Sequence, residues 1–124
     1  MPDRPDVPVA ATLDAAGAHA PRREATLAPP RPAPGLVAVT VGGSVGDYRT
    51  GDAIWCERLA PEAFASALNR DVLVPRPAGR FLFARLIGRD GDRLHLLPLG
   101  AGQRQQVIAD PPWIARAVTL VRAL

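Results

Sequence analysis

From residue 36 to residue 124 the chain is a series of short β-rich runs, each bounded by Gly, Pro or Asp. Regularly spaced runs of this kind, separated by turn residues, are typical of all-β barrels and folded sheets. The segment Arg89-Asp90-Gly91-Asp92 predicts a tight hairpin turn, because Asp-Gly tolerates positive φ. The pattern predicts strands at 36–41, 53–59, 71–75, 81–87, 93–99, 105–109 and 115–123. We therefore expect a mostly β fold, either a small barrel or a folded sheet.

One segment of this region departs from the strand pattern. Residues 61–69 begin with Pro61 and continue with Glu62, Ala63 and Phe64. Proline at a helix start followed by such residues predicts one or two helical turns. Because only this one short helix is expected, a helix-turn-helix DNA-binding motif is not.

The first 35 residues differ in composition. They hold eight of the 14 prolines and no aromatic residue, and Ala, Pro and Arg dominate them. Such a composition favours extended, polyproline-like chain. We therefore expect an extended Ala/Pro-rich arm or linker at 1–35, followed by one β domain at 36–124. An extended segment packed along the domain surface is the alternative, and 6–11 is the one candidate strand.

Composition excludes several classes of protein. No run approaches the roughly 18 apolar residues of a membrane span, so we expect a cytoplasmic protein without membrane contact. A lone Cys56 excludes an internal disulfide, and with His19 and His95 it makes no metal-ligand pattern. We therefore expect neither metal nor cofactor. The net charge of +3 is too mild to predict nucleic-acid binding by itself.

Few residues suggest chemistry. Ser44 lies in the glycine-rich bend 42–46, where an exposed serine is either a nucleophile or a turn residue bonding its own backbone. His95 is expected on the polar face of its strand, and His19 in the arm. Neither histidine lies at a sequence spacing from Ser44 that indicates a catalytic base. Trp113 is expected to cap a barrel end or to anchor a partner. Strand alternation places Phe81 and Phe83 on one face and Leu82, Ala84 and Leu86 on the other.

Several short segments follow one another in a particular order. They are Val7-Pro8-Val9, Ala15-Ala16-Gly17-Ala18, Gly42-Gly43-Ser44-Val45, Gly51-Asp52, Phe83-Ala84-Arg85-Leu86, Leu94-His95-Leu96-Leu97-Pro98 and Ala117-Val118-Thr119-Leu120-Val121. Their order and spacing resemble the C-terminal domain of LexA-type and phage-type self-cleaving repressors and of UmuD-like proteins. The resemblance implies a LexA-like β fold. It also implies that Ser44 occupies the position of the nucleophile and that Ala16-Gly17 occupies the self-cleavage site.

The departures from this family concern its general base. The lysine that takes the proton of the serine in the family falls on Ala84, and all 15 basic residues of the chain are Arg. Arg85 cannot replace it, because a guanidinium stays protonated. Val45 stands where the family has Met, and the segment between Ser44 and Gly51 is one or two residues shorter. We therefore expect a catalytically inactive domain with no self-cleavage at Ala16-Gly17.

Without self-cleavage, the function that the resemblance still implies is association with another chain. Such domains pair through β edges and their C-terminal region, so we expect a homodimer, or pairing with a related repressor, with Trp113, Val118 and Leu120 at the interface. DNA would be contacted only through a separate DNA-binding module. The alternatives are a phage-type structural or assembly protein that uses the N-terminal arm, a serine hydrolase using Ser44 with an unrecognised base such as His95, and a nucleic-acid-binding barrel using the Arg excess.

Overall fold

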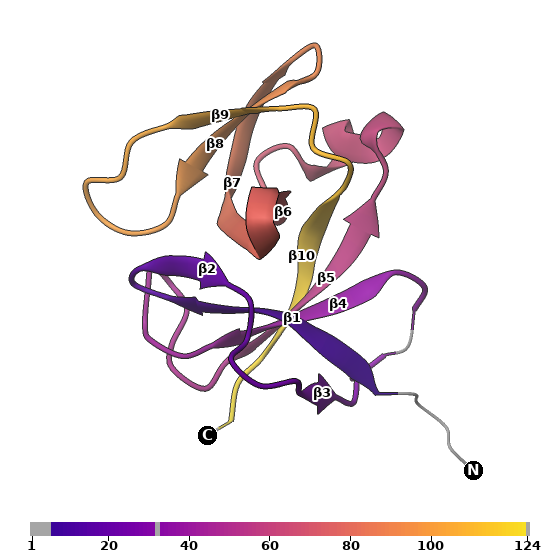
Figure 1. Cartoon of the computed structure of the whole chain (residues 1–124), viewed down its shortest axis with the longest axis vertical. Helices are drawn as coiled ribbons and strands as arrows, with labels where there is room; N and C mark the ends of the chain where they lie inside the picture. The colour runs from indigo at the N-terminus through magenta and orange to yellow at the C-terminus, as the bar shows by residue number, and fades with distance from the viewer. Residues whose placement is uncertain (1–5, 32, 124) are drawn as a thin grey trace.

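The computed structural model of the protein describes residues 6–31 and 33–123. Within these ranges it has ten strands and two short 3-10 helices (Figure 1). They are β1 (Val7–Asp14), β2 (Gly17–His19), β3 (Thr26–Leu27), β4 (Leu36–Val41), β5 (Ala53–Leu59), η1 (Pro61–Ala67), β6 (Asp71–Arg76), η2 (Pro77–Gly79), β7 (Arg80–Asp90), β8 (Arg93–Pro98), β9 (Gln106–Ala109) and β10 (Ile114–Val121). The expectation of a mostly β fold with one short helix at 61–69 is confirmed.

Seven of the described strands close into a barrel, in the order β1-β4-β5-β10-β6-β7-β2. The closure is made by β2, which pairs with β1 on one side and with β7 on the other. The β1–β4 pair is parallel and the other barrel pairs are antiparallel. β8 and β9 continue the sheet beyond β7, and β3 pairs with β1. The expectation of a small barrel is therefore confirmed.

The hydrophobic core has three parts, as the alternation of side chains across a sheet requires. Every barrel strand contributes to the first cluster, which therefore fills the barrel; it comprises Ala11, Leu13, Ala18, Val37, Val39, Val41, Ile54, Cys56, Leu73, Phe83 and Ala115. A second cluster lies on the outer face of β6, β7 and β10 under η1, β8 and β9, and includes Phe64, Val72, Ala84, Leu86 and Ile114. A third, around Val9, Ala38 and Trp55, is covered by β3.

The strands expected from residue 36 onward lie close to their predicted positions. β4 and β5 have the predicted bounds, and the remaining strands differ by one to three residues at an end. The turn at Gly91 has φ of 64°, which an Asp-Gly hairpin turn provides. Phe83 lies in the barrel interior and Ala84 in the second cluster, so the expected division of faces along β7 is confirmed.

Residues 7–27, expected to belong to an arm at 1–35, are part of the same fold as residues 36–123. Residues 7–27 supply three strands, and β1 and β2 are barrel members that bury Ala11, Leu13 and Ala18. The candidate strand at 6–11 is real, but it continues to Asp14. The physical reason is a period-2 pattern in which Val9, Ala11 and Leu13 are buried. The high proline content of the segment hides this pattern.

Candidate functional site

The bend that holds Ser44 joins β4 to β5 and is closed on itself. Ser44 Oγ lies 3.4 Å from Thr50 Oγ1 and accepts a hydrogen bond of 3.2 Å from the Thr50 backbone N–H. Two glycines with positive φ, Gly46 at 56° and Gly51 at 94°, shape the bend. Ser44 is exposed and both of its partners belong to its own loop. Its contacts are those of a turn serine.

The side chains considered as bases for Ser44 are engaged elsewhere in the described structure. His95 Nδ1 lies 2.8 Å from Gln105 Nε2, and His19 Nε2 lies 3.0 Å from Asp14 Oδ2. A serine nucleophile needs a base within hydrogen-bond reach, and no His, Asp or Glu in the described ranges is hydrogen bonded to Ser44.

The position expected for the missing lysine lies on the far face of β7 from the Ser44 loop. Ala84 is fully buried in the second cluster with Leu86. The β7 residue that meets the loop is Phe83, whose ring centroid lies 5.6 Å from that of Tyr48 in an edge-on contact. The structure therefore places Phe83, and not Ala84, against the loop.

Tyr48 anchors the same loop to β6. Its hydroxyl donates a hydrogen bond to Asp71 Oδ2, and Asp71 also lies 3.5 Å from Arg85 Nε. Burial and this hydrogen bond raise the pKa of Tyr48 above its ordinary range. Neighbouring Cys56 is enclosed in the barrel, where burial raises the pKa of its thiol to about 12. Both groups are therefore neutral at physiological pH, and this anchor was not predicted from the sequence.

The buried carboxylate of Asp52, in the Ser44 loop, binds Arg122, which follows β10. Asp52 is 2% exposed and accepts hydrogen bonds from Arg122 Nε at 2.8 Å and Arg122 Nη2 at 2.7 Å. The backbone N–H of Arg49 donates a third bond at 2.8 Å, and Arg122 Nη2 also reaches the Asp47 carbonyl at 3.2 Å. The hydrogen bonds from Arg122 lower the pKa of Asp52 to about 2. Arg122, which follows β10, therefore holds this end of the strand against the Ser44 loop.

Ala15 and Ala16 form the exposed turn between β1 and β2, and Gly17 is the first residue of β2. Gly17 has φ of 118°, and the Ala16 N–H donates to Asp14 Oδ1 at 2.9 Å. Both residues line a cleft of about 140 Å³ together with Val45, the residue after Ser44, and Phe83. The structure thus brings the expected cleavage site and the serine loop to one cleft, and the two β7 residues that line it, Leu82 and Phe83, are apolar.

The second half of β10 is an exposed apolar edge. β10 pairs with β5 along its length, but with β6 only at Ala115 and Arg116. Beyond those positions Val118, Leu120 and Val121 are 38%, 43% and 43% exposed. We call residues 118–121 the β10 edge. On the outer face beside it, Val118 and Trp55 line a groove of about 310 Å³.

Trp113 is placed differently from Val118 and Leu120. It immediately precedes β10, at the other end of that strand, and packs against the barrel core. The guanidinium of Arg58 lies 4.3 Å above its ring, a cation–π contact. The structure therefore brings Val118 and Leu120 together on one edge and leaves Trp113 apart from them.

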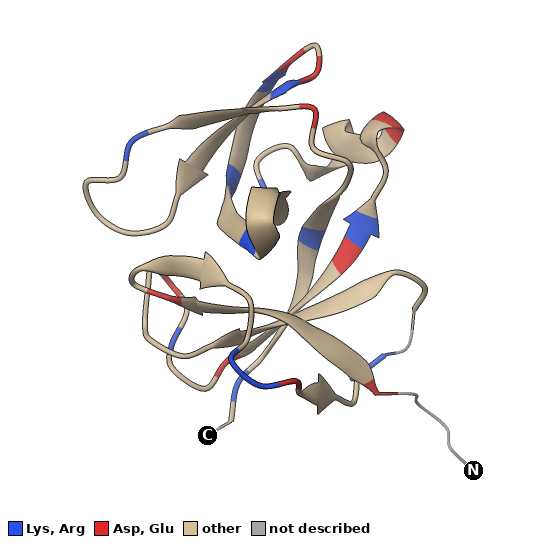
Figure 2. Cartoon of the chain, in the orientation of Figure 1, with Lys and Arg blue, Asp and Glu red and all other residues tan. Residues whose placement is uncertain are grey.

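Charges are spread over the molecule. Figure 2 shows basic and acidic segments interspersed over both the upper and the lower part of the molecule. Among residues 6–31 and 33–123, no cluster of three or more His, Cys, Asp or Glu is arranged to hold a metal. No helix in the same ranges has the length and apolar character needed to cross a membrane.

Comparison with known proteins adds no identification. No protein-family model, no curated protein and no solved structure matches the chain.

Proposed function

We propose that the chain is a non-catalytic domain of LexA-like type that associates in pairs through the β10 edge and serves a transcriptional repressor. The observation that carries the proposal is the edge itself, where β10 extends beyond its partner β6 and exposes three apolar side chains. Contact with DNA belongs, in this proposal, to a separate module.

The geometry of the edge favours a second copy, or a closely related chain, as the partner. An open strand edge presents unpaired N–H and C=O groups that pair readily with another strand. Arg70 Nη2 donates to the Ala117 carbonyl at 3.0 Å, so the open part begins beyond Ala117. Two such edges related by a twofold axis match each other in an antiparallel pair. That pairing also covers Val118, Leu120 and Val121.

The absence of catalysis is supported by the surroundings of Ser44. Its hydroxyl is held by Thr50, the β7 side chain that meets its loop is Phe83, and the sequence contains no lysine. Arginine does not act as a base at physiological pH. The hydrolase alternative therefore has no proton acceptor at Ser44 within the described residues.

Molar mass tests the proposal directly. In size-exclusion chromatography with light scattering, we expect a species of twice 13.1 kDa that dissociates on dilution. A monomer at every concentration contradicts homodimerisation. For the catalytic part, a serine-reactive fluorophosphonate is expected to leave the wild type as unlabelled as a Ser44→Ala control, and labelling that this variant abolishes contradicts the proposal.

A further inference from the structure

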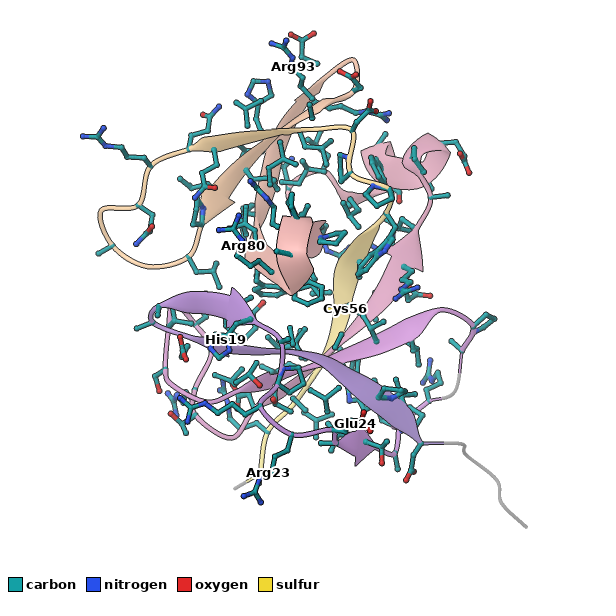
Figure 3. The ribbon with its side chains drawn as sticks, in the orientation of Figure 1. His19, Arg23, Glu24, Cys56, Arg80 and Arg93 are labelled. Atoms are coloured by element: carbon teal, nitrogen blue, oxygen red, sulfur yellow. The ribbon has the colours of Figure 1, made fainter. Side chains whose placement is uncertain are left out.

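Three side chains that can carry positive charge form a row across neighbouring strands. Arg76 of β6 is the register partner of Arg80 of β7, and Arg80 is the register partner of His19 of β2. Directly opposed residues have Cβ atoms about 5 Å apart on one face of the sheet. Figure 3 shows Arg80 beside the η2 turn, with His19 on the facing strand β2. All three residues line one cleft of about 360 Å³.

The chain holds the two arginines together at an energetic cost. Like charges directly opposite each other destabilise a strand pair. The connecting turn is η2, in which Ala78 adopts φ of 62° and Gly79 adopts φ of 71°. A left-handed conformation is unfavourable for a residue with a Cβ, so Ala78 adds strain to the same turn. Charge repulsion and backbone strain at one place are typical of binding sites.

The guanidinium groups of this row are open to a ligand. Among the described residues, Arg76 makes no ion pair or side-chain hydrogen bond, and the Arg80 guanidinium donates a single bond, of 3.4 Å, to the Pro77 carbonyl. No acidic residue is among the described residues that line the cleft. The nearby Asp14 is already engaged by His19 and by the Ala16 N–H. An anion entering the cleft therefore meets cations without a competing carboxylate in the cleft wall.

We propose that this cleft binds the phosphate group of a small phosphorylated ligand. Guanidinium forks match the oxygens of a phosphate, and two arginines side by side can each contact it in this way. The cleft volume lies in the range of small-molecule sites, which begins at about 300 Å³. Phe81 and Gln106, which also line the cleft, supply an apolar surface and an amide for the rest of the ligand. The site is independent of the β10 edge and of the proposed dimer.

Calorimetric titration of the full chain tests the site and identifies the source of the phosphate. The probes are inorganic phosphate, ribose 5-phosphate, AMP and adenosine at constant ionic strength. We expect binding of one or more phosphate-bearing probes and none of adenosine. Tighter binding of AMP than of ribose 5-phosphate assigns a nucleotide, whereas equal binding assigns a sugar phosphate or free phosphate. Binding of adenosine as tight as that of AMP, or binding of no probe, overturns the proposal.

Matched arginine variants separate the site from general charge. Arg76→Gln and Arg80→Gln are each expected to weaken the binding about tenfold or more, because each removes a charge-assisted fork. Arg93→Gln and Arg104→Gln remove the same charge from exposed arginines that line no part of the cleft, and are expected to leave the affinity unchanged. Equal weakening in both pairs overturns the proposal. Thermal melting of each variant establishes that the barrel is intact.

Discussion

Replacing Leu120 by serine is the sharpest test of the β10 edge. Full burial of a leucine side chain contributes about 1.5–3 kcal/mol. Because 43% of Leu120 is still exposed in the single chain, covering it in a dimer contributes about 1 kcal/mol per protomer. A twofold interface contains the residue twice, so Leu120→Ser costs about 2 kcal/mol and raises the dimer dissociation constant about 30-fold.

Sedimentation velocity over a range of concentrations measures this constant. The matched control is Leu97→Ser, because Leu97 on β8 is 40% exposed and lies on a strand that does not adjoin β10. The control is expected to dimerise like the wild type. If Leu120→Ser leaves the constant unchanged, or if Leu97→Ser weakens the dimer as much, the assignment of the interface to the β10 edge is wrong. Equal melting temperatures of the two variants exclude unfolding as the cause.

Three further predictions concern the loop and the core. The native pKa of Asp52 is depressed from 3.8 to about 2, so the stability it confers is present above the unfolded value and is lost as the pH falls toward the native one. In urea unfolding at several pH values, the free energy of unfolding is therefore expected to fall less on acidification in Arg122→Ala than in the wild type. The same dependence on pH in both proteins contradicts a stabilising Arg122–Asp52 ion pair. Tyr48→Phe removes the hydrogen bond to Asp71. The free energy of unfolding in urea is expected to fall by about 1 kcal/mol, because the acceptor is charged but the pair is only partly buried. An unchanged midpoint of unfolding shows that this hydrogen bond does not stabilise the loop. Cys56 is buried with its pKa raised to about 12, so iodoacetamide at neutral pH is expected to modify it only after denaturation, and rapid native labelling contradicts this.

Local sequence was sufficient for most of the strands. From Leu36 onward each strand is a short apolar run that ends at turn residues. The dipeptide Asp90-Gly91 is by itself enough to predict a tight hairpin turn. The alternation along β7 likewise predicts which of its side chains share a face, and the structure shows that the face with Phe83 lines the barrel interior. The lack of lysine is a property of composition alone and needs no structure.

Barrel closure could not be predicted in this way. β1 pairs in parallel with β4, and the three-residue strand β2 joins β1 to β7 across about half of the chain. A strand of three residues has no measurable period, and the prolines around it favour an interpretation as an arm. The pairing of β1 and β2 with other strands, together with the packing of Ala11, Leu13 and Ala18 into the barrel, shows that this segment belongs to the fold.

The strand-rich fold class, the turns and the lack of lysine follow from the sequence alone, because they depend on neighbouring residues or on composition. Which distant residues come into contact depends on the three-dimensional packing of the strands. This packing brings Arg122 to Asp52, opposes Arg76 to Arg80 beside His19, and leaves the β10 edge open where β6 ends. Such contacts depend on strand register and barrel closure, which are set by packing over the whole chain and leave no local sequence signal.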